Sequence, residues 1–344
     1  MALQPLPGFR SLVTHHCVTG SMRHIYEHHG YPISEDTLLG LGEGVGFVYW
    51  HMKGTTPMYG GRANVGRPGE EGLEKAAGRR TGVRVESFAT SSAQKAEKAL
   101  FDLLSSGEPV MLQVDMGYLP YLDLPPDFHF GGHVVVVAGF DPATRQVLVA
   151  DRDQPLHPVS GQDLALARGS QHKPFPPRHT WYSFDFAGRR PPRPAEVREA
   201  IRSVAINMLE PPIANLGVKG IRRAATATLE WPKLMDEEEI RRICFNIFIF
   251  IDARGGSGGG IFRYMYGRFL GEAAALTGDG RLAEVGEQMR EIGDRWQQVA
   301  RAFYAACEAP HPAAALAEAV APLPEIADRE QAAWEGLRRV MSNG

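Results

Sequence analysis

The chain has 344 residues, which at roughly 100–200 residues per domain predicts two domains or one large one. Lysine and arginine together number 37 and aspartate and glutamate 40, so the net charge of −3 excludes a strong field that would recruit nucleic acid. The three cysteines, at positions 17, 244 and 307, are too few for a disulfide framework and favour a reducing compartment.

The sequence shows no pattern of an export signal or a membrane span. Residues 1–16 lack the long apolar stretch and the basic leader of a secretory signal. The most apolar run, residues 243–251, is far shorter than the roughly 20 residues that a helix needs to cross a bilayer. We therefore expect a cytoplasmic protein that does not bind a membrane.

Residues 1–190 have the pattern of an α+β domain. Apolar residues Val18, Met22 and Ile25 share one face of a helix over 17–29, and a second helix begins at 34–36. Residues 54–68 are expected to form a loop. Further helices are expected at 69–80 and 92–104, and strands at 83–88, 110–114, 133–140, 146–150 and 181–186. A helical start followed by a mostly antiparallel half is typical of the α+β class.

Residues 191–344 have the pattern of an all-α domain. The proline-rich stretch 188–197 predicts the linker before it, because proline disfavours helix in the residue that precedes it. Helices are expected at 195–208, 212–228, 236–252, 260–276, 281–307 and 312–341. The run Gly255–Gly260 predicts either a flexible joint or a close approach of backbone.

Cys17 is the candidate nucleophile because it stands at the start of the first expected helix. The dipole and N–H groups of a helix N-terminus stabilise a thiolate, which is the reactive form of cysteine. Taken alone, such a cysteine is more often a small buried hydrophobic residue than a nucleophile. Cys244 and Cys307 lie in expected helices, have no candidate catalytic partner, and are interpreted as packing residues.

A histidine and an aspartate provide candidate partners for Cys17. His133 opens one expected strand and Asp151 ends the next, with a turn at 141–145 between them. If the hairpin is centred on Pro142, these two residues lie directly opposite one another, where Cβ atoms are about 4.5–5.5 Å apart. An aspartate at that distance can hold the imidazole in one tautomer. The sequence thus predicts a Cys17–His133–Asp151 triad, although each member also has a purely structural interpretation.

Three segments, 15–50, 131–153 and 255–274, resemble the butirosin biosynthesis protein H family. The resemblance implies a papain-like N-terminal domain over 1–190 and a helical C-terminal domain over 191–344. It also implies acyl transfer in natural-product biosynthesis, from the thioester of an acyl carrier protein or a similar donor to an amine. By this resemblance Cys17 carries the acyl group, His133 is the base and acid, and Asp151 orients it.

One departure from the papain pattern concerns the oxyanion hole. Papain-like enzymes usually place a glutamine a few residues before the cysteine, and residues 10–16 contain none. The Cys17 backbone N–H, with Thr14 or His16, is the candidate replacement.

The acceptor pocket is expected from the segments 40–46, 54–68 and 115–130. The last of these carries the candidate pocket residues Tyr118 and His129, together with Tyr121.

Other functions stay open at this point. The same triad would serve a cysteine hydrolase, amidase or peptidase, and an inactive relative would only bind a ligand or a carrier protein. The 12 histidines leave a metal hydrolase as a further alternative, but no CxxC or HExxH motif occurs, so we expect neither a metal nor another cofactor. An aromatic stripe in the helical part, residues 262–269, is compatible with a homodimer.

Overall fold

The computed structural model describes residues 3–51, 55–66, 71–125, 127–254 and 258–342. The chain divides into two compact units: the first contains residues 1–38 and 81–191, and the second contains residues 39–80 and 192–344. The chain crosses between the units three times, and the third crossing, after Pro191, lies next to the domain boundary expected near residue 190. Residues 39–80 were expected in the N-terminal domain, but they pack with the helical unit instead.

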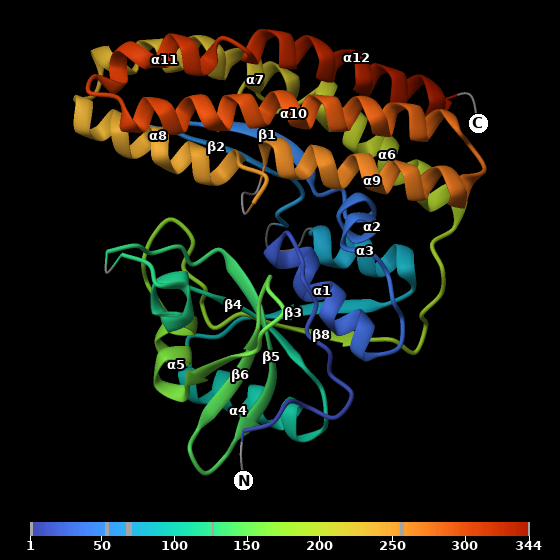
Figure 1. Cartoon of the computed structure of the whole chain (residues 1–344). Coiled ribbons are helices and arrows are strands. Elements are labelled where there is room, and N and C mark those ends of the chain that lie inside the picture. The colour runs from blue at the N-terminus through green and yellow to red at the C-terminus, as the bar shows by residue number, and fades with distance from the viewer. Residues whose placement is uncertain (1–2, 52–54, 67–70, 126, 255–257, 343–344) are drawn as a thin grey trace. The chain divides into compact units, whose positions relative to one another are not determined.

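The first unit is built on a six-stranded antiparallel sheet with the order β3-β8-β4-β5-β6-β7 (Figure 1). The strands are β3 (Arg84–Phe88), β4 (Val110–Val114), β5 (His133–Asp141), β6 (Gln146–Ala150), β7 (His157–Ser160) and β8 (Trp181–Asp185). Five of these were expected from the sequence to within a residue or two, whereas β7 was not. The mixture of helices with this antiparallel sheet is consistent with the α+β class.

Helices pack against this sheet. They are α1 (Cys17–His28), α4 (Ala93–Ser105) and α5 (Gly161–Gly169), while α2 (Glu35–Leu41) begins in the first unit and ends in the second. Leu100 and Leu104 of α4 and Leu164 of α5 join alternate strand residues, such as Val135 and Val137, in one buried core. This alternation follows from the two-residue period of a strand, which sends every second side chain to the same face. Helix α1 packs against β4 and β5.

A β-bulge interrupts the pairing of β5 with β6. Val137 pairs with Val149 and Gly139 with Leu148, so Ala138 is an extra residue on β5. The carbonyl of Ala138 accepts a hydrogen bond from the backbone N–H of Leu6 at 2.7 Å. A Cβ atom at Gly139 would lie 2.4 Å from the carbonyl oxygen of Gln4, so only glycine lets the N-terminal segment lie this close.

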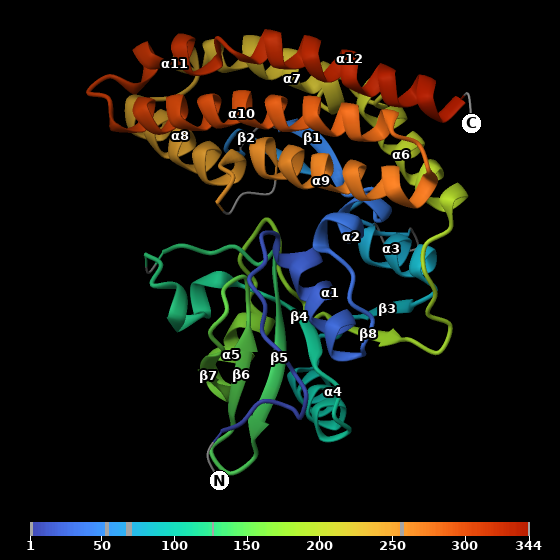
Figure 2. The same ribbon diagram turned by 45° about the vertical axis from the view of Figure 1, so that its right-hand side comes forward.

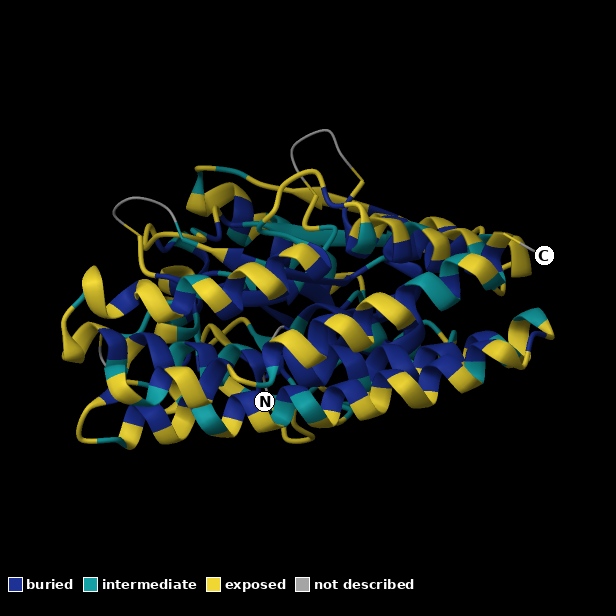
Figure 3. Ribbon diagram, turned by 90° about the horizontal axis from the view of Figure 1, so that it is seen from above, coloured by how far each residue is buried: buried dark blue, intermediate teal, exposed yellow. Residues whose placement is uncertain are grey.

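The second unit is mainly helical. Its helices are α3 (Leu73–Thr81, whose last residue belongs to the first unit), α6 (Pro194–Leu209), α7 (Gly217–Ala227), α8 (Glu237–Ile251), α9 (Gly259–Thr277), α10 (Arg281–Glu308), α11 (Pro312–Val320) and α12 (Leu323–Ser342). Seen from above, these helices alternate buried and exposed stripes (Figure 3). The single helix expected over 312–341 is two helices, because Pro322 between them lacks a backbone N–H.

A two-stranded hairpin lies within the core of the helical unit (Figure 2). Its strands β1 (Val45–Trp50) and β2 (Met58–Arg62) are antiparallel, so part of the expected loop 54–68 is a strand. Phe47 stacks on Trp296 of α10, and the Tyr59 hydroxyl lies 2.6 Å from Thr228 Oγ1. These aromatic contacts explain why the hairpin belongs to the second unit.

The structure describes only part of the Gly255–Gly260 run. Residues 255–257 of the Gly255–Gly260 run lie outside the described residues, and α9 begins within the run, at Gly259. Among the described helices, none is both long enough and apolar enough to cross a membrane.

Candidate active site

Cys17 is the first residue of α1 and is partly exposed. The residue before it, His16, has extended backbone and caps the helix with its side chain. His16 Nδ1 accepts a hydrogen bond from the Thr19 backbone N–H at 3.5 Å and lies 3.1 Å from Thr19 Oγ1. Because Nδ1 accepts, the hydrogen of a neutral His16 ring is on Nε2. The helix start that the sequence predicts at Cys17 is therefore the observed one.

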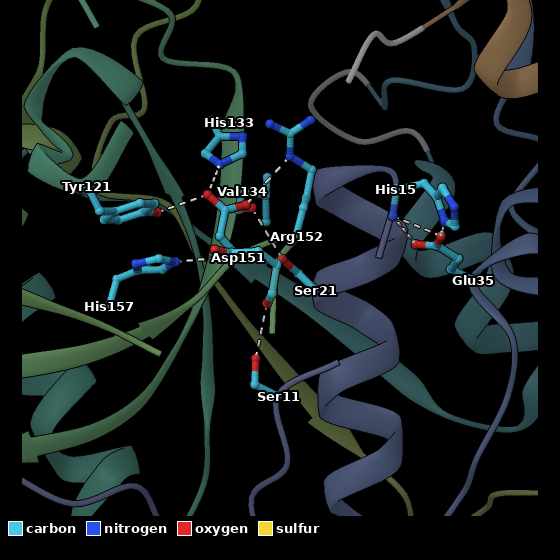
Figure 4. Close-up of polar contacts among 11 residues, drawn as sticks. Ser11, His15, Ser21, Glu35, Tyr121, His133, Val134, Asp151, Arg152 and His157 are labelled. Carbon is cyan, nitrogen blue, oxygen red and sulfur yellow. Dashed lines mark hydrogen bonds and ion pairs between the residues drawn. The ribbon is translucent and has the colours of Figure 1, made fainter. Parts of the chain in front are cut away.

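The segment before Cys17 is held from two sides. The Thr14 backbone N–H donates to the carbonyl of Arg152 at 2.8 Å, which ties the segment to the end of β6. The His15 backbone N–H donates to both oxygens of the buried Glu35 carboxylate at 2.9 and 3.1 Å, and the His15 ring contacts the same carboxylate (Figure 4). Glu35 is also the first residue of the helix that the sequence predicts to begin at 34–36. Its second role is to fix the loop that carries Cys17.

His133 and Asp151 form a buried pair. His133 Nε2 lies 2.8 Å from Asp151 Oδ2, and both side chains are 4% exposed. The Tyr121 hydroxyl donates to the same Oδ2 at 2.9 Å (Figure 4). Asp151 Oδ1 has no hydrogen bond in the described part of the chain, and the nearest cationic atom is Arg152 Nε at 3.9 Å.

The pKa values of this pair move apart. Burial by itself would lower the pKa of His133, but the charge and hydrogen bond of Asp151 and a hydrogen bond with Cys17 raise it to about 9. Burial would raise the pKa of Asp151, but His133, Arg152 and Tyr121 together lower it to about 2. The stable state of the pair at neutral pH is therefore imidazolium beside carboxylate.

Cys17 reaches the same histidine. Its side chain lies near enough to the ring to raise the pKa of His133 through hydrogen bonding and charge. Since His133 Nε2 is bonded to Asp151, Nδ1 is the ring nitrogen left for the thiol. The structure thus brings together the three residues that the sequence singled out, in the order Cys17, His133, Asp151.

The register that was expected to bring His133 and Asp151 together was wrong. The turn is centred later than Pro142, so Asp141 pairs with Gln146. Continued through β5, that register would place His133 and Asp151 on opposite faces of the sheet, because side chains alternate. The bulge leaves Ala138 of β5 without a partner on β6, so the register shifts by one residue. His133 and Asp151 therefore lie on the same face of the sheet. They are diagonal neighbours rather than directly opposed residues.

The two oxyanion candidates are both buried near the start of α1. Thr14 is 6% exposed, and its Oγ1 has no hydrogen-bond partner in the described part of the chain. It packs so closely over α1 that a Cβ atom at Gly20 would lie 2.4 Å from that oxygen. His16 is 3% exposed and is used as the helix cap. Thr14 therefore has a hydroxyl oxygen that makes no hydrogen bond in the described part of the chain, whereas His16 uses Nδ1 in the helix cap.

Tyr118 and His129, the expected pocket residues, lie together around the buried Asp115. His129 Nδ1 lies 3.0 Å from Asp115 Oδ2, and the Ser170 hydroxyl donates to the same oxygen at 2.5 Å. Tyr118 lies against His129 and lines a cavity of about 530 Å³. None of the residues that line this cavity belongs to the Cys17–His133–Asp151 group.

The three segments that were expected to form the acceptor pocket do not all lie in the same unit. The backbone N–H groups of Gly117 and Phe130 donate to Asp115 Oδ1 and so close the loop that includes Tyr121. The bond from Tyr121 to Asp151 was not foreseen, because no sequence signal links residues 30 positions apart. Segments 40–46 and 54–68 belong to the second unit where they are described.

The described residues contain no group of three or more histidine, cysteine, aspartate or glutamate side chains that could hold a metal ion.

The chain combines two units: an α+β unit, in which a cysteine, a histidine and an aspartate lie close together, and a mainly helical unit. Residues 162–337 match a domain of unknown function, DUF4872, and residues 16–152 match butirosin biosynthesis protein H, N-terminal. The first match spans more than half of the chain, which therefore belongs to that family and has an N-terminal part of the butirosin biosynthesis protein H type. The butirosin biosynthesis protein H type of the N-terminal part implies a biosynthetic enzyme. No curated protein matches the chain.

Proposed function

We propose that this protein is a cysteine-dependent acyltransferase of natural-product biosynthesis. The observation that carries the proposal is the contact of Cys17, at the N-terminus of α1, with a histidine that is itself hydrogen-bonded to a buried aspartate. A helix N-terminus and an adjacent imidazolium both stabilise a thiolate. The same arrangement, with the cysteine on a helix and the histidine on a strand, supports a papain-like catalytic domain.

In the first half-reaction the Cys17 thiolate attacks the carbonyl carbon of a thioester donor. The bond between that carbon and the donor sulfur breaks, and His133 gives its proton to the departing thiolate. The acyl group is then held on Cys17 as a new thioester. The oxyanion formed on the way would accept hydrogen bonds from the Cys17 backbone N–H and from Thr14 or His16.

In the second half-reaction an amine attacks the acyl-Cys17 carbonyl. Neutral His133 takes a proton from the attacking nitrogen, the bond from carbon to Cys17 sulfur breaks, and an amide is released. Asp151 keeps the imidazole in one orientation through both steps by its bond to Nε2. Because water could replace the amine, a hydrolase differs from this enzyme only in what reaches the acyl-cysteine.

The family supports the choice of substrates. A family named for butirosin biosynthesis favours a carrier-protein thioester as acyl donor and an amine-bearing small molecule as acceptor. We further propose that the helical part, 191–344, completes the enzyme. Phe262, Tyr266 and Phe269 of its aromatic stripe are buried, so the stripe does not offer a surface for a homodimer.

Denaturing mass spectrometry tests the proposal directly. The whole protein is incubated with short acyl thioesters of pantetheine, and the mass increase is located by peptide mapping. We expect an acyl adduct on Cys17 that disappears in Cys17→Ala. The control is Cys307→Ala, which removes another cysteine, at the end of α10, and leaves the adduct in place.

Product analysis then separates transfer from hydrolysis. With a polyamine or an aminoglycoside added, an amide product supports the acyltransferase, whereas free acid alone shows a hydrolase, amidase or peptidase on the same triad. A Cys17 that reacts with neither thioesters nor alkylating reagents would show an inactive relative that only binds its ligand. Stoichiometric zinc in the purified protein would overturn the proposal in favour of a metal hydrolase.

A further inference from the structure

Asp151 holds two hydrogen-bond donors on one oxygen. His133 Nε2 and the Tyr121 hydroxyl both approach Oδ2, at 2.8 and 2.9 Å, and no donor reaches Oδ1 in the part of the chain that is described. The two donors therefore share the charge of a single carboxylate oxygen. In Figure 4 the Tyr121 hydroxyl points at this oxygen from the side opposite α1.

Tyr121 is itself held rigidly. It lies in the short 3-10 helix Pro120–Leu122, and its ring stacks on His157 with centroids 4.0 Å apart and planes 11° apart. His157 Nε2 lies 2.8 Å from Asp153 Oδ1. The loop that carries Tyr121 is closed by Asp115, whose side chain is fully buried. The ring of Tyr121 and the loop that carries it are therefore both held in place.

We propose that Tyr121 is a positioning residue that limits how strongly Asp151 holds the proton on His133. The inference rests on the proposed acyl transfer, in which His133 must both give and take a proton. By donating to Oδ2, the hydroxyl withdraws negative charge from the atom that His133 faces. It also stops the carboxylate from rotating about its Cβ–Cγ bond.

Loss of the Tyr121 hydroxyl should change the pKa of His133 in a definite direction. Without the hydroxyl, the charge on Oδ2 acts on His133 alone, so the imidazolium is stabilised and the pKa of His133 rises further. The other titratable groups around the pair are Cys17 on α1, Arg152 and Asp153 after β6, and His24, which senses the charge of Asp151. Within the described residues, none of these groups is placed to donate to Asp151 Oδ2 instead of the Tyr121 hydroxyl.

The test is Tyr121→Phe, read out by NMR titration of His133 in protein labelled at histidine. The His133 signal is assigned by its loss in His133→Asn. We expect the titration midpoint to rise by about half a pH unit. We also expect the alkaline limb of Cys17 acylation to move with it, while KM for the thioester stays the same.

Two further variants separate tuning from simple loss of structure. Tyr31→Phe is the matched control, because Tyr31 also donates its hydroxyl within the first unit, to the carbonyl of Arg190, but lies outside the site. It should leave the His133 midpoint unchanged. In an Asp151→Asn background, Tyr121→Phe should no longer shift the midpoint, since the effect runs through the carboxylate.

If Tyr121→Phe does not fold, incorporation of 3-fluorotyrosine at position 121 replaces it. The more acidic hydroxyl is a stronger donor and should lower the His133 midpoint. An unchanged midpoint in both variants, or a shift of the opposite sign, overturns the inference. Because the NMR titration needs no substrate, its outcome is separate from the acylation, product and zinc assays of the unaltered protein that test the proposed function.

Discussion

Asp151 in the first unit and Glu330 in the second are both buried carboxylates, and they are satisfied to different degrees. Glu330 accepts from Arg263 Nε and Nη2 at 2.9 and 2.8 Å, and from the Trp296 and Trp334 indoles at 2.8 and 3.1 Å. The remaining Arg263 nitrogen, Nη1, donates to the carbonyl of Gly46. Every polar atom of this ion pair thus has a partner.

Asp151 is satisfied on one side only. Both of its donors use Oδ2, and one of them, His133, can lose its proton, with a pKa that its surroundings raise to about 9. Arg263 cannot do so, because a guanidinium stays charged. The comparison shows that burial of charge alone does not mark an active site. What distinguishes the two pairs is an exchangeable proton next to a partly exposed cysteine, Cys17, the candidate nucleophile.

The largest effect should come from Cys17→Ala. Loss of the nucleophile should reduce acyl transfer by about 10³-fold or more, because no other group can form the covalent intermediate. Thermal unfolding should hardly change, since Cys17 is partly exposed and the cap from His16 remains. Activity assays with a thioester donor and a thermal melt measure the two quantities. Retained activity would remove Cys17 from the mechanism.

Glu330→Ala should have the opposite profile. It leaves the fully buried Arg263 without its counter-charge, which costs about 3–5 kcal/mol in the free energy of unfolding. Denaturant unfolding of the whole chain measures the loss. Arg222→Ala, which breaks an exposed pair with Asp328, is the control and should cost under about 1 kcal/mol. Equal costs for the two variants would contradict the structural role of the buried pair.

Asp151→Asn should move the pH dependence of acyl transfer. Because the Asp151 charge raises the pKa of His133 to about 9, its removal should bring the alkaline limb of the rate down by about one unit or more. Rates measured from pH 5 to pH 10 check this shift. An alkaline limb that stays near pH 9 would show that another group controls it.

The His133–Asp151 pair should also make the stability of the protein depend on pH. His133 has its pKa raised above the ordinary value of 6.5, so its contribution is complete below 6.5 and is lost as pH rises through about 9. Asp151 has its pKa lowered from 3.8, so its contribution is complete above 3.8 and is lost as pH falls towards about 2. Melting temperatures of the unaltered protein and Asp151→Asn should therefore differ most between about pH 4 and pH 6.5. A difference that does not depend on pH would contradict the linkage.

The smallest effect is expected from Gly139→Ala. The added Cβ would meet the carbonyl of Gln4, so the N-terminal segment must move away from the bulge, at a cost of about 1–2 kcal/mol in stability. Gly107→Ala, at another site in the first unit, controls for the loss of a glycine, because its positive φ strains any side chain while nothing lies near the added atom. Denaturant midpoints compare the two variants. If Gly139→Ala costs no more than Gly107→Ala, the close approach is unimportant.

Much of the local structure was readable from the sequence. The start of α1 at Cys17 and the extents of β4 and β6 were predicted as observed, because hydrophobic period and turn residues are local signals. The same signals do not say which segments pack together. The hairpin 45–62 was missed as part of the helical unit because its partners, such as Trp296, lie far along the chain.

The sequence by itself determined the residue types and their order: a cysteine at a helix start, then a histidine and an aspartate at the ends of neighbouring strands. Only the tertiary structure decided how they meet. The bulge at Ala138 changed the register by one residue, and a single residue decides which face of a sheet a side chain occupies. The contacts of Tyr121 and Glu35 likewise depend on loops brought together by folding, which no spacing along the chain encodes.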